Sequence, residues 1–197
     1  METLHVLGMA GSLRKNSYNR FLLRAALELA PEGMKFTTFD LAPVPLYNAE
    51  MDGEVKPKPV MALKNAIREA DALLFVTPEY NHGIPGVLKN AIDWASRPAG
   101  RSPLAGKPAA IMGASQGLWG TVRAQIQLRQ VLAATNTHVV LKPEILVAKA
   151  QNKFDAEGRL TDKGTREFVR ELLEALGDWT LRLRGKEPSF TVGEDGE

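Results

Sequence analysis

The stretch Leu4-His5-Val6-Leu7-Gly8-Met9-Ala10-Gly11-Ser12-Leu13-Arg14-Lys15-Asn16-Ser17-Tyr18-Asn19-Arg20 decides how this chain folds. A short apolar run, typical of a buried strand, breaks at small residues. It is followed by hydroxyl, amide and basic side chains, and then by an apolar pattern with helical spacing. The stretch therefore predicts a strand, a loop and the N-terminus of a helix. Such a loop directs main-chain N–H groups and the positive end of the helix dipole toward one point, where an anion can bind.

The side chains of this loop favour a phosphate as that anion. Ser12, Ser17 and Asn19 are candidate donors, and Arg14 can add a charge-assisted hydrogen bond. Neither the glycine pattern of dinucleotide-binding loops nor that of the P-loop is present. A loop rich in hydroxyl and amide groups suits a single terminal monophosphate, as in a mononucleotide. The alternative is that Ser17 or Asn16 only caps the helix.

Composition limits the class of protein. The 197 residues suffice for one domain with a full core, and 44% hydrophobic and 24% charged residues are typical of a soluble globular protein. A net charge of +2 gives no reason to expect a nucleic-acid or membrane partner. The absence of cysteine excludes disulfides, thiol chemistry and cysteine-bound metals, and no His/Asp/Glu cluster has metal-ligand spacing. Without a signal-peptide pattern or a membrane-spanning apolar run, the expected location is the cytoplasm.

Strand and helix patterns alternate along the chain. Strands are expected at the apolar run that begins at Leu4 and within residues 35–41, 72–77, 108–113 and 138–147, the last interrupted at Pro143-Glu144. Helices are expected over residues 21–30, 60–70, 86–96, 118–134 and 160–183, and an extended loop over the rim of the site is expected at residues 42–48. This alternation predicts an α/β fold with a three-layer, doubly wound, five-stranded parallel sheet of flavodoxin-like order 2-1-3-4-5. It is expected to form one domain over residues 1–185, followed by a polar tail, 186–197.

Two further loops extend the predicted site. Ligands of such a sheet bind at the carboxyl ends of the first and third strands, so the loop after the third strand should contribute. That loop, residues 77–86, has an irregular backbone whose amides need partners, and Tyr80 and Asn81 offer an aromatic surface and an amide. In the loop 113–120, small residues permit close approach to a planar group; the alternative is a simple turn that uses glycine for positive φ. Together the loops predict a site for a phosphorylated planar ring.

Three motifs carry a resemblance to a known family. They are Gly11-Ser12-Leu13-Arg14-x-x-Ser17-x-Asn19-Arg20, Pro78-Glu79-Tyr80-Asn81-x-x-x-Pro85-Gly86-x-Leu88-Lys89-Asn90-Ala91-Ile92-Asp93-Trp94 and Gly113-x-x-x-Gly117-x-x-Gly120-x-x-Arg123. In this order they resemble the NADPH-dependent FMN reductase family, which includes chromate and quinone reductases. The match covers roughly residues 4 to 135, and nothing specific to the family follows Val147.

The resemblance implies a set of cofactor-binding residues. Those on the side of the FMN phosphate are Ser12, Leu13, Arg14, Ser17 and Asn19. Those around the isoalloxazine, acting largely through main-chain groups, are Pro78, Glu79, Tyr80 and Asn81. The ring and ribityl contacts are completed by Ser115, Gln116 and Gly117.

The resemblance also implies the activity. It indicates an FMN-dependent NAD(P)H oxidoreductase that transfers hydride from NADPH or NADH, through bound FMN, to quinones, chromate or similar small acceptors. No side chain is needed as an acid or base, because the flavin carries the chemistry. A homodimer or homotetramer is implied, with the flavin close to a subunit interface. The alternatives are a flavodoxin-like electron carrier without nicotinamide turnover, which the net charge of +2 disfavours, and a non-catalytic phosphate or nucleotide sensor.

Several other residues have interpretations that do not depend on the three motifs. His5 and His138 lie in predicted strands and are interpreted as structural, whereas His82 lies in the flavin loop and is a weaker candidate for substrate contact. The segment Arg97–Arg101 either binds phosphates of the nicotinamide nucleotide or is a solvated turn. The tryptophans fall in helical patterns and are expected in the core or an interface: Trp94, Trp119 and Trp179.

Overall fold

The structure is a computed structural model that describes residues 3–186, so residues 187–197 of the predicted tail lie outside the described part. The strands are β1 (Leu4–Ala10), β2 (Met34–Phe39), β3 (Ala72–Val76), β4 (Pro108–Ala114), β5 (His138–Val139) and β6 (Ile145–Val147). The α-helices are α1 (Tyr18–Glu28), α2 (Lys58–Glu69), α3 (Gly86–Ala95), α4 (Val122–Ala134) and α5 (Lys163–Leu183). Short 3₁₀ turns lie at Ala49–Met51 and Ala150–Asn152.

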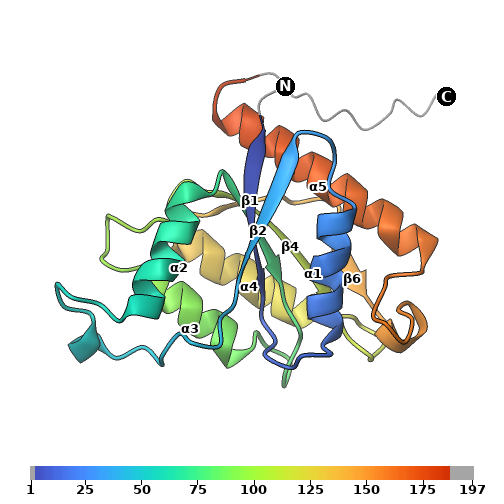
Figure 1. Cartoon of the computed structure of the whole chain (residues 1–197), viewed down its shortest axis with the longest axis horizontal. Helices are drawn as coiled ribbons and strands as arrows, with labels where there is room; N and C mark the ends of the chain where they lie inside the picture. The colour runs from blue at the N-terminus through green and yellow to red at the C-terminus, as the bar shows by residue number, and fades with distance from the viewer. Residues whose placement is uncertain (1–2, 187–197) are drawn as a thin grey trace.

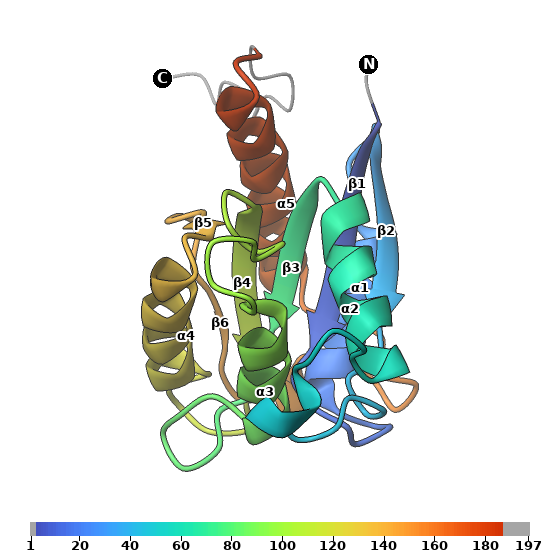
Figure 2. The same cartoon turned by 90° about the vertical axis from the view of Figure 1, so that its left-hand side faces the viewer.

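The sheet has the predicted parallel topology. The strand order is β2-β1-β3-β4-β5, with β6 also paired to β4, and each of these pairs is parallel. The predicted fifth strand is two short strands, because β5 pairs with the start of β4 and β6 with its end. Pro143, which lacks a main-chain donor, lies between them. In Figure 2 the strands point toward the bottom of the view, where the loops after β1, β3 and β4 lie.

Two hydrophobic cores hold the three layers together. One lies between the sheet and the pair α1 and α5, and the other lies between the sheet and α2, α3 and α4 (Figures 1 and 2). In β3, Leu74 and Val76 pack into the first core, while Leu73 and Phe75 pack into the second. Both faces of this strand are therefore buried, which explains its continuous apolar sequence.

The helix α4 begins later than the pattern predicts. Leu118 and Trp119 lie in an exposed loop, and the helix begins only at Val122. Between them Gly120 has a φ of +58°, and an added Cβ there would lie 2.9 Å from the main-chain carbon of Leu146. The main chain at Leu146 lies so close that position 120 requires a glycine in a left-handed conformation. This conformation is not helical, so α4 begins after Gly120 and does not include Leu118 and Trp119.

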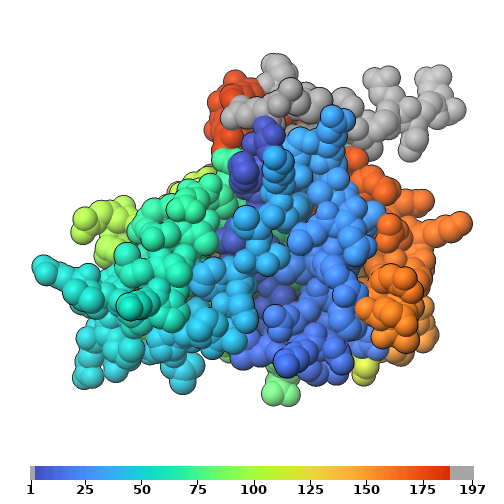
Figure 3. All heavy atoms as spheres, in the orientation of Figure 1, coloured from blue at the N-terminus to red at the C-terminus, as the bar shows by residue number. Residues whose placement is uncertain are grey.

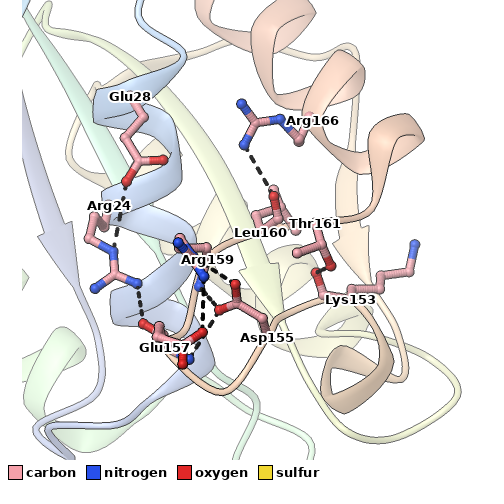
Figure 4. A network of polar contacts seen from close by, with 9 residues as sticks. All are labelled: Arg24, Glu28, Lys153, Asp155, Glu157, Arg159, Leu160, Thr161 and Arg166. Carbon is pink, nitrogen blue, oxygen red and sulfur yellow. Dashed lines mark hydrogen bonds and ion pairs between the residues drawn. The ribbon is translucent and has the colours of Figure 1, made fainter.

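The helix α5 also begins later than predicted, at Lys163. Residues 153–161 form a loop that folds against α1, where the Arg24 guanidinium donates to the carbonyl of Glu157 at 2.8 Å (Figure 4). Within the loop the Asp155 carboxylate accepts from the Arg159 side chain at 2.7 Å. Asp162 caps the helix by accepting from the main-chain N–H of Thr165 at 2.9 Å.

The proline-containing loop 42–48 is tied to α3. The carbonyl of Pro45 accepts from Asn90 Nδ2 at 2.9 Å and from Trp94 Nε1 at 2.8 Å, and Tyr47 N donates to Asn90 Oδ1 at 2.7 Å. Trp94 is fully buried in the core, as predicted, whereas Trp119 lies outside it. Asn90 and Trp94 of the second motif therefore serve to anchor this loop.

Candidate functional site

The loops after β1, β3 and β4 meet at the carboxyl edge of the sheet and enclose a cavity of about 340 Å³. This volume lies within the usual range of small-molecule sites. Its lining residues are Ser12, Arg14, Ser17, Tyr18, Asn19, Pro78, Glu79, Tyr80, Ala114, Ser115 and Gln116. Three predicted residues lie in the same loops but outside this lining: Leu13, Asn81 and Gly117. Sequence reasoning missed Tyr18 and Ala114, whose residue types carry no signal for a ligand.

The first loop presents donors that no protein group uses. Within residues 3–186, the main-chain N–H groups of residues 12–16 have no hydrogen-bond acceptor. Arg14 lines the cavity and has no carboxylate within ion-pair distance in the same part of the chain. Ser17 caps α1, because its Oγ accepts from Asn19 N at 3.2 Å, and it also faces the cavity. Capping and ligand contact are therefore compatible at Ser17.

Asn19 joins the first loop to the third. Its side chain is buried, and its Nδ2 donates to the carbonyl of Ala114 at 2.9 Å. Its Oδ1 accepts from the N–H of Ala114 at 2.8 Å. Because the amide oxygen and one N–H are used in this way, a single N–H is left for a ligand. Asn19 chiefly fixes the separation of α1 from the end of β4.

The second loop forms a tight turn at the lower edge of the molecule, where it projects as a small green group in Figure 3. Tyr80 and Gly83 exchange two main-chain hydrogen bonds of 3.0 Å. Asn81 and His82 between them have φ values of +50° and +63°. Tyr80 Oη lies 3.4 Å from Ser12 Oγ, which connects this loop to the first. His82 is exposed at the turn and does not line the cavity.

The third loop is held by the side chain of Ser115 and by the end of β6. Ser115 N donates to the carbonyl of Val147 at 2.9 Å, and Ser115 Oγ accepts from Gly117 N at 3.1 Å. Near the end of β4, just before this loop, a Cβ on Gly113 would lie 2.3 Å from the Thr77 carbonyl oxygen. Glycine at this position is therefore required for the second and third loops to come together.

Two larger hollows, of about 610 and 560 Å³, lie away from this edge. Neither is lined by a residue of the three loops. Arg97 lines the first of them, at the C-terminal end of α3, whereas the second loop leads into the N-terminal end of that helix. The length of α3 is about 15 Å at 1.5 Å per residue, so the segment Arg97–Arg101 lies apart from the cavity.

Residues 3–186 contain no group of three or more His, Asp or Glu side chains that could hold a metal ion. No helix among them has the length and apolar character that crossing a membrane requires.

The fold and the three loops define a class of protein: a flavodoxin-like α/β protein whose ligand cavity lies at the switch point of the sheet. A family model of NADPH-dependent FMN reductases matches residues 4–152. The chain belongs to this family. The match confirms the predicted family, enzyme class and cofactors, which are FMN and NAD(P)H.

Individual relatives agree with the family assignment. An NAD(P)H-dependent FMN reductase of Pseudomonas aeruginosa is 50% identical over 184 residues, which cover 93% of this chain and 99% of that protein. A quinone reductase of Escherichia coli K12 is 41% identical over 186 residues, covering 93% and 98%. Among solved structures, the flavoenzyme NAD(P)H:acceptor oxidoreductase FerB of Paracoccus denitrificans matches with a TM-score of 0.84 at 37% identity, covering 91% and 98%.

Proposed function

We propose that this chain uses bound FMN to pass reducing equivalents from NAD(P)H to quinones and similar small acceptors such as chromate. The observation that carries the proposal is the convergence of three loops on one cavity, with unused donors at one end and a tyrosine at the other. The names of the Pseudomonas FMN reductase and the Escherichia coli quinone reductase support this acceptor class.

The first loop fits the phosphate of FMN. The unused main-chain N–H groups of residues 12–16 lie beside the N-terminus of α1, where the helix dipole favours an anion. Arg14 adds a cation without a carboxylate partner in the described part of the chain, and Ser17 adds a hydroxyl. These groups would hold the dianion by charge-assisted hydrogen bonds.

The second and third loops fit the ring. The main-chain N–H groups of Glu79 and Gln116, both in the cavity lining, have no acceptor within residues 3–186. A ring edge that bears carbonyl oxygens and nitrogens would satisfy them. When bound, FMN supplies the hydride chemistry. The protein binds and orients the ring, and its N–H groups stabilise negative charge at the ring edge.

We further propose a homodimer or homotetramer in which the interface lies near this site. Leu118 and Trp119, in the loop before α4, are 69% and 67% exposed, and Ile126 on α4 is 64% exposed. Large exposed apolar side chains gathered within one short segment of the chain, residues 118–126, support a subunit interface. We expect Trp119→Glu to lower the oligomeric mass measured by light scattering, whereas Glu54→Gln, on the exposed connection before α2, should leave it unchanged.

The function is tested with purified protein loaded with FMN. We expect a yellow protein that oxidises NADPH or NADH, faster when a benzoquinone is added, with the parallel double-reciprocal lines of ping-pong kinetics. An electron carrier would bind FMN and oxidise almost no NAD(P)H. A sensor would bind a nucleotide without turnover. Protein that stays colourless after incubation with FMN would contradict the assignment of the site.

A further inference from the structure

The turn of the second loop is closed by two hydrogen bonds of its own and is also contacted by α4. Asn81 and His82 both adopt left-handed backbone conformations, which non-glycine residues adopt at a cost in free energy. Such conformations persist when surrounding structure imposes them, and they occur often at functional sites. Because this loop is expected to contact the ring mainly through main-chain groups, its shape matters more than its side chains.

The first support is the Glu79 carboxylate. Its Oε2 accepts from Arg123 N at 2.9 Å and from Ala124 N at 3.1 Å, and its Oε1 lies 3.6 Å from the Arg123 guanidinium. Its side chain is only 10% exposed. Thr121, at the N-cap position of α4, makes no side-chain capping bond. Glu79 therefore caps α4 from the second loop, with its negative charge at the positive end of the helix dipole.

The second support is Gln127, one helical turn beyond Arg123 on α4. Its Oε1 accepts from Ile84 N at 2.7 Å, directly after the turn. A Cβ added to Gly83 would lie 2.8 Å from the same oxygen, so the amide fits closely against the loop. The helix α4 thus holds the loop on both sides of the turn, at Glu79 before it and at Ile84 after it.

We propose that Glu79 and Gln127 are positioning residues that hold the ring-binding turn of residues 80–83 against α4. This inference rests on the proposed function. Through these two side chains, the helix fixes the main-chain donors of the loop relative to the flavin ring. In this proposal the Glu79 carboxylate has a role in addition to the main-chain contact that its motif implies. Gln127 also has a role, although it lies outside the three motifs.

The experiment compares holo-protein variants for binding of FMN and of riboflavin, which lacks the phosphate. Gln127→Ala removes one hydrogen bond to the loop, so we expect both affinities to fall by the same factor, roughly 2- to 10-fold. Glu79→Gln removes a charged acceptor, and we expect roughly 10- to 100-fold for both ligands. Gln127→Glu retains an acceptor oxygen and should restore most of the affinity. The matched control is Gln130→Ala, an exposed glutamine on the same helix without a hydrogen-bond partner in the described part.

A spectroscopic readout separates positioning from general destabilisation. We expect the visible absorption and circular dichroism bands of bound flavin to change in Gln127→Ala and Glu79→Gln, and to return in Gln127→Glu. If Gln127→Ala and Glu79→Gln match Gln130→Ala in both affinities and in these bands, the inference is wrong, although wild-type protein still binds FMN. If wild-type protein itself binds no FMN, the proposed function fails instead.

Discussion

The two ends of the cavity are built differently. At the first loop, the main-chain N–H groups of residues 12–16 and the Arg14 guanidinium have no acceptor within residues 3–186. At the second loop, Tyr80 pairs with Gly83, and Glu79 and Ile84 are bonded to α4. A phosphate provides strong acceptors when it binds, so its donors can remain solvated until then. A planar ring forms weaker polar contacts and benefits from a surface that is formed in advance.

Asn19, which joins α1 to the end of β4, should show the largest effect. We expect Asn19→Ala to lower the free energy of unfolding by about 2–4 kcal/mol, because it leaves the buried N–H and carbonyl of Ala114 without partners. The measurement is urea unfolding of the protein without FMN. Asn16→Ala, at an exposed position in the same loop, is the control and should change the value by less than about 0.5 kcal/mol. Equal values for the two variants would contradict the assigned role of Asn19.

A substitution in the first loop should weaken FMN binding without lowering the free energy of unfolding. We expect Arg14→Gln to weaken FMN binding by about 1.5–3 kcal/mol, the usual contribution of a hydrogen bond to a charged group. Riboflavin affinity and the free energy of unfolding should stay unchanged. Lys15→Gln, at the exposed neighbour that does not line the cavity, is the control. A parallel loss of riboflavin affinity in Arg14→Gln would place Arg14 at the ring rather than at the phosphate.

Ser17 has two roles that substitutions can separate. Ser17→Ala removes the cap of α1 and should lower the free energy of unfolding by about 1 kcal/mol. Ser17→Asp retains a capping oxygen and should keep the stability of the wild-type protein, while its charge repels the phosphate. We therefore expect Ser17→Asp to be stable and to bind riboflavin better than FMN. If it still prefers FMN, the phosphate does not lie at Ser17.

Much of this architecture could be predicted from local sequence. The apolar run of β3 and the loop from Gly11 to Asn19 each indicate their own structure, because the relevant forces act between near neighbours. The parallel topology alone predicts the edge of the sheet at which the three loops meet. The late start of α4 could not be foreseen in this way. It depends on contact between Gly120 and Leu146, which are far apart in the sequence.

The sequence also did not indicate the hydrogen-bond partners of individual motif residues. Asn19 and Glu79 belong to motifs that indicate a flavin site, yet their side chains bond to the protein at Ala114 and at the start of α4. Asn90 and Trp94 likewise hold Pro45. A motif records that a residue type is required without recording its partner. These partners lie tens of residues away along the chain, so only the folded arrangement reveals them.

The smallest expected effect lies away from the cavity, at the N-terminus of α5. Hydrogen bonds from the Thr165 side chain, and then from Lys153, lower the pKa of Asp162 to about 2. Because this pKa is lower than in the unfolded chain, the carboxylate stabilises the fold above about pH 4, and its contribution is lost as the pH falls toward 2. The Asp162 side chain is 38% exposed, so solvent screening limits the contribution to less than about 1 kcal/mol.

Asp162→Asn tests how much the charge of Asp162 contributes to the free energy of unfolding at a site away from the cavity. Asparagine also caps helices well, so the variant removes the charge and leaves a capping oxygen. We expect urea unfolding at a series of pH values to show a weaker loss of stability between pH 4 and pH 2 than in wild-type protein. FMN affinity at pH 7 should stay unchanged, because Asp162 does not line the cavity. If the free energy of unfolding falls with pH as it does in wild-type protein, the charge of Asp162 does not stabilise the fold. If FMN affinity falls, the site extends beyond the three loops.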